Sequence, residues 1–297
     1  MSLEQNLISI VKSKEMKTTI AIAVFLVLCL GINAQEAFQS NKLVKVWSTP
    51  AGLNVPESSH YNPFDNTIYV SNIVGKHDVK DGVGFISKLN VKGEFIEKEW
   101  VKGLNAPKGI TCTKTKLYVT DIDRVVEISL KSGKILKEYR NTKSKSLNDV
   151  CVAANGRVYV SDDSGDCIFY VGKDSLEVLI QSKSLGGMNG IYASGNLLYL
   201  GSKGNFISVD QKTKAITVLQ EKVGYLDGIE QVSPTVFVTS DWRGHVQLIT
   251  LSKGVEKLLD TTLLKINAAD LGYIPSQKLL LVPTFLENKV VAYQINW

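Results

Sequence analysis

The chain of 297 residues carries a net charge of +5, and 44% of its residues are hydrophobic. These values are those of an ordinary globular protein, and no linker-like stretch divides the chain, so one folded domain is expected. The excess positive charge comes from scattered lysines, because arginine occurs only at Arg124, Arg140, Arg157 and Arg243. A nucleic-acid-binding function is not expected, since it favours an arginine-bearing basic stripe interleaved with aromatic residues.

An export signal is predicted for residues 1–34. Lys17 precedes an apolar run over residues 20–30, and Ala34 follows as the small residue before a cleavage point. Met16 begins this pattern better than Met1, so the true start is open between them. Because the apolar run is too short to cross a bilayer as a helix, we expect an exported protein, periplasmic or secreted, without a stable membrane anchor. Residues 35–297 are predicted to form the folded domain.

Three cysteines remain after residue 34: Cys112, Cys151 and Cys167. An odd number argues against a disulfide framework. Cys112 and Cys151 lie in apolar, strand-like segments, where we expect buried thiols, with a disulfide as the alternative. No Cys-x-x-Cys pair and no cluster of cysteine and histidine occurs, so a structural zinc site is not expected.

A strand-rich unit of about 40 residues recurs six times along the chain. Its most regular part is an apolar strand, found at 68–70, 117–119, 158–160, 198–200, 236–238 and 279–281. A polar pair follows each of these strands, such as Ser71-Asn72 or Ser161-Asp162, and we expect it to turn the chain. The sequence therefore predicts an all-β fold, a six-bladed β-propeller of four-stranded blades.

The last repeat lacks its fourth strand, because the chain ends at Trp297. The apolar segment 42–47 precedes the first repeat and can supply that strand. We therefore expect an N-terminal strand to close the ring and cover an open sheet edge. A two-sheet sandwich is the alternative, although it does not require a sixfold period.

One polar residue precedes each apolar strand by nine to eleven positions, at the start of the predicted innermost strand. These residues are Glu57, Lys108, Asn148, Asn189, Asp227 and Asp270. Since the innermost strands of a propeller surround its axis, the six side chains are expected to face one another. Carboxylate and amide oxygens suit a hard cation such as calcium or magnesium. The alternative is that these residues, with glycines such as Gly190 and Gly228, only turn the chain.

The pairs Pro56-Glu57, Asn148-Asp149, Asn189-Gly190 and Asp227-Gly228 resemble those of the gluconolactonase-like family, which includes senescence marker protein and luciferin-regenerating enzyme. The resemblance implies a six-bladed propeller with one divalent cation at its axis, held by Glu57, Asn189 and Asp227. Calcium is the expected ion, with zinc, manganese and magnesium as alternatives. The chain departs from the family at Ser146, where an arginine is common, and at Lys108, whose charge opposes a metal.

The resemblance implies a metal-dependent hydrolase of small lactones or related cyclic esters, and the N-terminal pattern predicts that it is exported. In this hypothesis Asp227 is a metal ligand and the base, Asn148 orients a small-molecule substrate, and Lys108 stabilises an oxyanion or holds a carboxylate. Asp270 is a further substrate-binding candidate. His60 is expected to pack inside a blade, or else to line the next layer of the channel.

A binding propeller without a catalytic metal, like the looser NHL-repeat and strictosidine-synthase-like propellers, is the alternative function. The oligomeric state and the substrate are not predicted.

Overall fold

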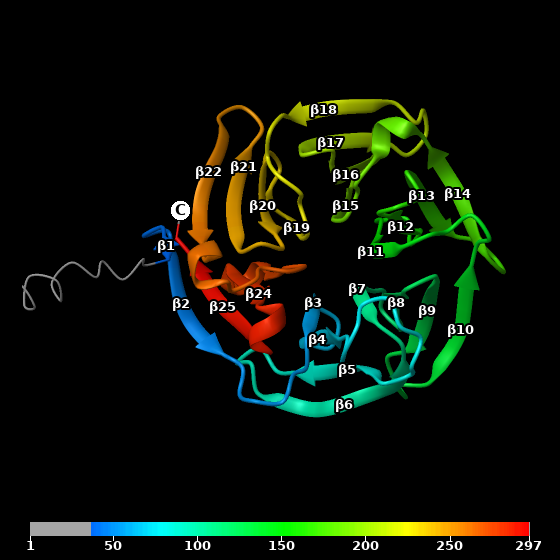
Figure 1. Cartoon of the computed structure of the whole chain (residues 1–297), viewed down its shortest axis with the longest axis horizontal. Helices are drawn as coiled ribbons and strands as arrows, with labels where there is room; N and C mark the ends of the chain where they lie inside the picture. Colours follow the sequence, from blue (N-terminus) through cyan, green and yellow to red (C-terminus); the bar gives the residue numbers. More distant parts are fainter. Residues whose placement is uncertain (1–36, 297) are drawn as a thin grey trace, which may run out of the picture. The chain divides into compact units, whose positions relative to one another are not determined.

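Six antiparallel sheets surround a common axis in the computed structural model, which describes residues 37–296 (Figure 1). Written from the innermost strand outward, blade 1 is β3 (Pro56–Asn62), β4 (Thr67–Asn72), β5 (Gly84–Leu89) and β6 (Phe95–Leu104); blade 2 is β7 (Pro107–Cys112), β8 (Lys116–Asp121), β9 (Arg124–Ser129) and β10 (Ile135–Arg140); blade 3 is β11 (Leu147–Val152), β12 (Val158–Asp162), β13 (Cys167–Val171) and β14 (Leu176–Gln181). Blade 4 is β15 (Ile191–Ser194), β16 (Leu197–Ser202), β17 (Asn205–Asp210) and β18 (Ile216–Gln220); blade 5 is β19 (Ile229–Ser233), β20 (Val236–Asp241), β21 (His245–Thr250) and β22 (Gly254–Asp260); blade 6 is β23 (Gly272–Ile274), β24 (Leu279–Pro283), β25 (Val290–Ile295) and β2 (Leu43–Ser48). The predicted six-bladed propeller is confirmed.

The apolar strand that marks each repeat is the second strand of its blade, and both of its faces are buried. Ile68, Tyr69 and Val70 of β4 are all fully buried. Ile68 and Val70 pack with blade 6, whereas Tyr69 packs with blade 2. A strand that alternates between two cores must be apolar at every position. This explains why the sequence repeats a continuous apolar run rather than an alternating one.

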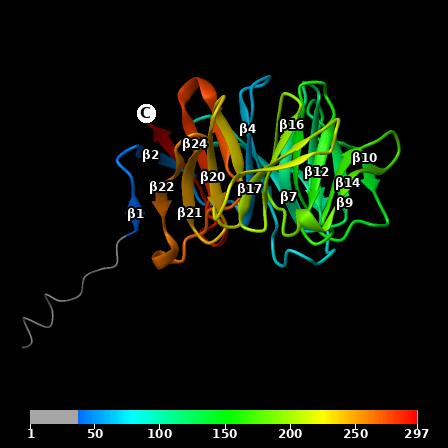
Figure 2. The same ribbon diagram turned by 90° about the horizontal axis from the view of Figure 1, so that it is seen from above.

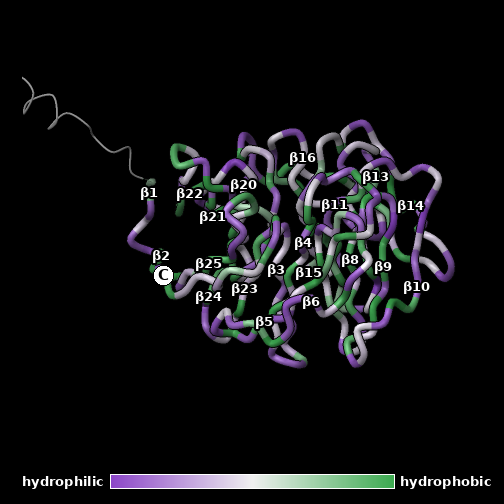
Figure 3. The backbone as a smooth tube through the Cα atoms, turned by 60° about the horizontal axis from the view of Figure 1, so that its bottom comes forward, coloured by the Kyte–Doolittle hydropathy of each residue, from purple (hydrophilic) through white to green (hydrophobic). Residues whose placement is uncertain are grey.

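Six hydrophobic clusters lie between the blades, and each combines residues of two neighbouring blades. No blade can therefore bury its apolar faces alone, as expected for a repeat architecture. Loops connect the strands at the two faces of the ring (Figure 2). Apolar stretches follow the strands, and hydrophilic stretches are common in these loops (Figure 3).

The ring is closed by the N-terminal part of the propeller, as predicted. Strand β2 pairs with β25 as the fourth strand of blade 6, with Leu43 opposite Ile295 and Ser48 opposite Val291. A second strand was not predicted: β1 (Phe38–Gln39) pairs with β22 and adds a fifth strand to blade 5 (Figure 1). The same segment thus joins two neighbouring blades.

The polar pairs after the apolar strands do not turn the chain, which corrects that prediction. Ser71 and Asn72 end β4, and Ser161 and Asp162 end β12, all four fully buried. The serine hydroxyls accept hydrogen bonds from backbone N–H groups of the innermost strand, and the Asn72 and Asp162 side chains accept from the loop before it. The Asp162 carboxylate, for example, accepts from the backbone N–H groups of Lys145 and Ser146, both at 2.9 Å.

The cysteine prediction is confirmed, because Cys112, Cys151 and Cys167 are buried and free. No helix within residues 37–296 combines the length and hydrophobicity needed to span a membrane. The predicted export signal, residues 1–34, lies outside the described residues.

Candidate functional site

The six predicted polar residues lie at matching positions of the six blades. Glu57, Lys108 and Asn148 are the second residues of β3, β7 and β11. Asn189, Asp227 and Asp270 each lie two residues before β15, β19 and β23. These innermost strands surround the axis in Figure 1. We call the six residues the first ring.

A β-bulge turns the first-ring side chains of blades 1, 2 and 3 out of the regular ladder. In blade 1, Pro56 pairs with Asn72, but the next pair is Ser59 with Val70, so two residues of β3 oppose one of β4. The same shift occurs after Pro107 in β7 and after Leu147 in β11. Bulges re-aim side chains, and here they act on Glu57, Lys108 and Asn148.

Buried hydroxyl groups tie the first ring of one blade to that of the next. The Ser161 hydroxyl of β12 accepts from the Asp149 backbone N–H at 2.9 Å and donates to the Asn189 carbonyl at 2.6 Å. In blade 5, the Ser240 hydroxyl accepts from the Gly228 N–H at 2.8 Å and donates to the Ala269 carbonyl at 2.7 Å. A cross-blade bridge of this kind fixes the backbone that carries each ring residue.

Gly190 and Gly228 are close-packing positions, not turn residues, so the turn interpretation of these pairs is wrong. Neither glycine has a positive φ. A Cβ atom on Gly190 would lie 2.3 Å from the Asp227 carbonyl oxygen, and one on Gly228 would lie 2.3 Å from the Leu271 nitrogen. Glycine is required because neighbouring innermost strands approach closely at the axis.

Four first-ring side chains bury oxygen atoms that have no hydrogen-bond partner within the described residues. These atoms are Glu57 Oε2, Asn148 Oδ1, Asn189 Oδ1 and Asp227 Oδ1. Glu57 is 5% exposed and Asp227 is 2% exposed. Buried polar atoms are nearly always satisfied in folded proteins, by protein groups, water or a ligand, so four such oxygens in one ring mark it as a candidate site.

The first-ring charges act on one another. Burial raises the pKa of Glu57 well above its ordinary value, the Asp227 charge raises it further, and the Lys108 ammonium opposes both effects. Burial also raises the pKa of Asp227 to about 7, although the Lys108 charge and the Asn189 amide both lower it. Lys108 is buried, yet it forms no ion pair or hydrogen bond with any described residue. The ring therefore holds a surplus of carboxylates without direct neutralisation.

Asp270 is held differently from the other members of the first ring. Its carboxylate accepts a hydrogen bond from the Ser58 hydroxyl at 2.5 Å. It also lines a cavity of about 270 Å³ in the channel, which Glu57, Lys108, Asn148, Asn189 and Asp227 do not line. The sequence did not predict this cavity.

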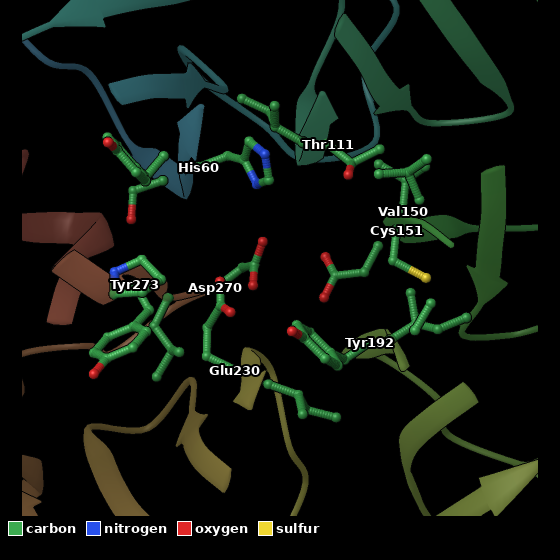
Figure 4. Close-up of a pocket in the computed structure, with 18 of the residues that line it drawn as sticks. His60, Thr111, Val150, Cys151, Tyr192, Glu230, Asp270 and Tyr273 are labelled. Atoms are coloured by element: carbon green, nitrogen blue, oxygen red, sulfur yellow. The ribbon is translucent and has the colours of Figure 1, made fainter. Parts of the chain in front are cut away.

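The cavity is surrounded by one residue from each blade, three positions after the first ring. These residues are His60, Thr111, Cys151, Tyr192, Glu230 and Tyr273 (Figure 4), and we call them the second ring. Counting three residues from each first-ring member would have found all six. Asp149, next to Asn148, also lines the cavity.

His60 lines the cavity. The expectation that it packs inside a blade is therefore wrong, and the alternative, that it lines the next layer of the channel, is confirmed. Burial lowers its pKa to about 4, so the imidazole is neutral at pH 7. Burial raises the pKa of Glu230 well above its ordinary value, and the Asp270 charge adds to this effect.

Within residues 37–296, no group of three or more His, Cys, Asp or Glu side chains is arranged to hold a metal ion. The unpartnered donors of the first ring are two carboxylates and two amides.

No family model matches the chain, and no curated protein matches it. Solved structures do match. The nidogen/laminin complex contains a chain with a TM-score of 0.62 and 15% identity, over 74% of this chain and 84% of that one. Streptogramin B lyase aligns with a TM-score of 0.59 and 13% identity, over 88% and 97% of the two chains. A catalytically inactive virginiamycin B lyase from Staphylococcus aureus with quinupristin gives 0.57 and 11%, over 88% and 100%.

At these identities the likeness shows the fold. The chain is a six-bladed propeller.

Proposed function

We propose that the first ring binds a divalent cation and that the chain is a metal-dependent hydrolase of small lactones or related cyclic esters. The observation that carries this proposal is the set of four unpartnered, buried oxygens on Glu57, Asn148, Asn189 and Asp227. The four residues stand at matching positions of four different blades, which supports one shared ligand at the axis.

The chemistry of these donors fits a hard cation. Glu57, Asn189 and Asp227 would hold it through two carboxylates and one amide carbonyl, the oxygen ligands that calcium prefers. The positive charge would also offset the surplus of carboxylates around the axis. When bound, a divalent cation polarises an ester carbonyl and lowers the pKa of a water molecule.

The chain's own residues supply the remaining roles. We assign to Asp227 the acceptance of a proton from the attacking water. The Asn148 amide orients the substrate by hydrogen bonding, and the Lys108 ammonium stabilises negative charge that develops on the carbonyl oxygen. Asp270, a first-ring residue that Ser58 holds and that also lines the cavity, contacts the substrate on the side of the cavity. The N-terminal pattern of Lys17, the apolar run and Ala34 supports export to the periplasm or the medium.

Lys108 favours a second candidate function. The ammonium group of a buried lysine that forms no ion pair also suits an anionic ligand. In that case the chain is a binding propeller that uses the same ring without a catalytic metal.

One experiment separates the two candidates. The purified protein is stripped with a chelator and titrated with calcium, zinc and manganese by calorimetry, and a panel of lactones is assayed with and without chelator. The hydrolase predicts binding of one cation per chain and hydrolysis that the chelator abolishes and the cation restores. Absence of both cation binding and chelator-sensitive hydrolysis contradicts the hydrolase, and anion binding in chelator then supports the binding propeller.

A further inference from the structure

The cavity around the second ring offers open space in which a ligand can bind. Its volume of about 270 Å³ lies just below the usual range for drug-sized ligands, so it suits a small molecule. Pro63 and Pro275 also line it. Both follow the end of an innermost strand, so the cavity extends toward the face opposite the first ring.

Acidic side chains dominate the polar lining of this cavity. Asp149, Glu230 and Asp270 contribute three carboxyl groups, and no lysine or arginine lines it. Lys108 belongs to the first ring and does not line the cavity. Figure 4 shows Asp270 and Glu230 extending into the central space, with His60 on the side of blade 1. When these carboxyl groups ionise, they repel an anionic ligand and attract a cationic one, and a bound cation in turn favours their ionised form.

Asp149 supplies an independent indication of a ligand. Its side chain is only 3% exposed, it lines the cavity, and its Oδ1 atom has no hydrogen-bond partner within the described residues. A buried carboxylate oxygen in this state is costly unless a ligand satisfies it.

Tyrosines make up much of the remaining wall. Tyr61, Tyr192 and Tyr273 line the cavity beside aliphatic residues such as Val150 and Ile191. Aromatic faces attract organic cations, and aliphatic side chains accommodate alkyl groups. A bare metal ion would not use this surface. The three carboxyl groups also do not form a metal-holding group within residues 37–296.

We propose that this cavity binds a small organic ammonium ion, with the charged nitrogen among Asp149, Glu230 and Asp270 and the alkyl groups against the tyrosines. This second site is independent of the proposed hydrolase. It lies in the same channel and shares Asp270 with the proposed substrate site, but it uses none of the proposed metal ligands and needs no metal.

Calorimetry on the purified protein in chelator tests the proposal with three compounds. Choline is a quaternary ammonium ion and ethanolamine a primary one, whereas 3,3-dimethyl-1-butanol has the shape of choline with carbon in place of nitrogen. At least one cation is expected to bind about tenfold or more tightly than the alcohol. Tighter binding of choline assigns the larger contribution to the tyrosine faces, and tighter binding of ethanolamine assigns it to the carboxylates.

Substitutions locate the site. Glu230→Gln keeps the size of the side chain and is expected to weaken cation binding about tenfold, without changing the affinity for the alcohol. Glu97→Gln, on the exposed outer strand β6, is the matched control and should leave binding unchanged. Asp149→Asn is the second variant, used if thermal unfolding shows that Glu230→Gln does not fold. Equal affinity for the cations and the alcohol, or unchanged cation binding in a folded variant, overturns the proposal.

Discussion

The two rings of the channel come from the same six blades, three residues apart, but they differ in how their side chains are held. The first ring lies where neighbouring innermost strands approach closely, at bulges in blades 1, 2 and 3 and beside cross-blade hydroxyl bridges such as that of Ser240. The second ring lies three residues further along the chain in each blade, and its side chains surround a cavity. One strand can thus carry a site for a compact hard cation and, one layer further, a site for a larger organic ion.

Asp227→Asn tests the first ring most severely. It removes one carboxylate from the cation site and the proposed base, while keeping the size of the side chain. Cation affinity is expected to fall about 10–100-fold, and lactone hydrolysis about 10²–10⁴-fold. Calorimetry and steady-state kinetics measure the two effects.

Glu97→Gln is the matched control for Asp227→Asn, because Glu97 is an exposed carboxylate on the outer strand β6. Both its cation affinity and its activity should equal those of the unmodified protein. If Asp227→Asn instead folds and retains full cation affinity, the ligand set is wrong.

The second largest expected effect is on the pH dependence of the free energy of unfolding, measured in the presence of chelator. Because burial raises the pKa of Asp227 from its ordinary value of 3.8 to about 7, the folded state holds this proton more tightly than the unfolded chain. The resulting stability is fully present below pH 4 and is lost as the pH rises to 7. The loss is on the order of 2–4 kcal/mol. Urea unfolding at pH 4, 5.5 and 7 measures it.

The informative quantity in this experiment is the difference between the protein and its Asp227→Asn variant, because Glu57 and other groups titrate in the same range. The variant should lose less stability between pH 4 and 7, and saturating calcium should reduce the loss in the unmodified protein. Parallel pH curves for the two proteins would show that ionisation of Asp227 does not destabilise the folded protein.

The fold was largely predictable from the sequence, because the second strand of each blade is buried on both faces and is therefore apolar at every position. The two-residue strand β1 was not predictable, since Phe38-Gln39 is too short to show a periodic pattern. Ser161 and Ser240 were mistaken for turn residues because a buried hydroxyl that bridges two blades and an exposed one in a turn are the same residue type in a sequence.

The candidate site was predictable in its first ring only. Polar residues stand out there because they interrupt an apolar context. The second ring mixes histidine, threonine, cysteine, tyrosine and glutamate, and these residue types share no property that a repeat can reveal. Tyr192 and Glu230 could be placed together only by counting three residues from Asn189 and Asp227, that is, from the register of the first ring.

Lys108→Met tests the role of the positive charge in the first ring, and its expected effect on cation affinity is smaller than that of Asp227→Asn. The substitution keeps an apolar stem but removes the positive charge from the first ring. Removing one like charge near the cation is worth on the order of 1–2 kcal/mol, so calcium should bind about tenfold more tightly. Turnover should fall at the same time if the ammonium stabilises the developing oxyanion. Weaker calcium binding in Lys108→Met, measured by calorimetry, would contradict the assigned roles.

The smallest expected effect decides whether the channel contains two sites or one. Asp270 links the rings electrostatically, because its charge acts on both Glu57 and Glu230. A divalent cation in the first ring should therefore weaken binding of an organic cation in the second ring, but only about twofold, since the charges are not in contact. Titrating choline into calcium-saturated and calcium-free protein measures this coupling. Linkage requires that choline weaken calcium binding by the same factor. A change of tenfold or more in either direction, or mutually exclusive binding, would mean that both ligands occupy one continuous site.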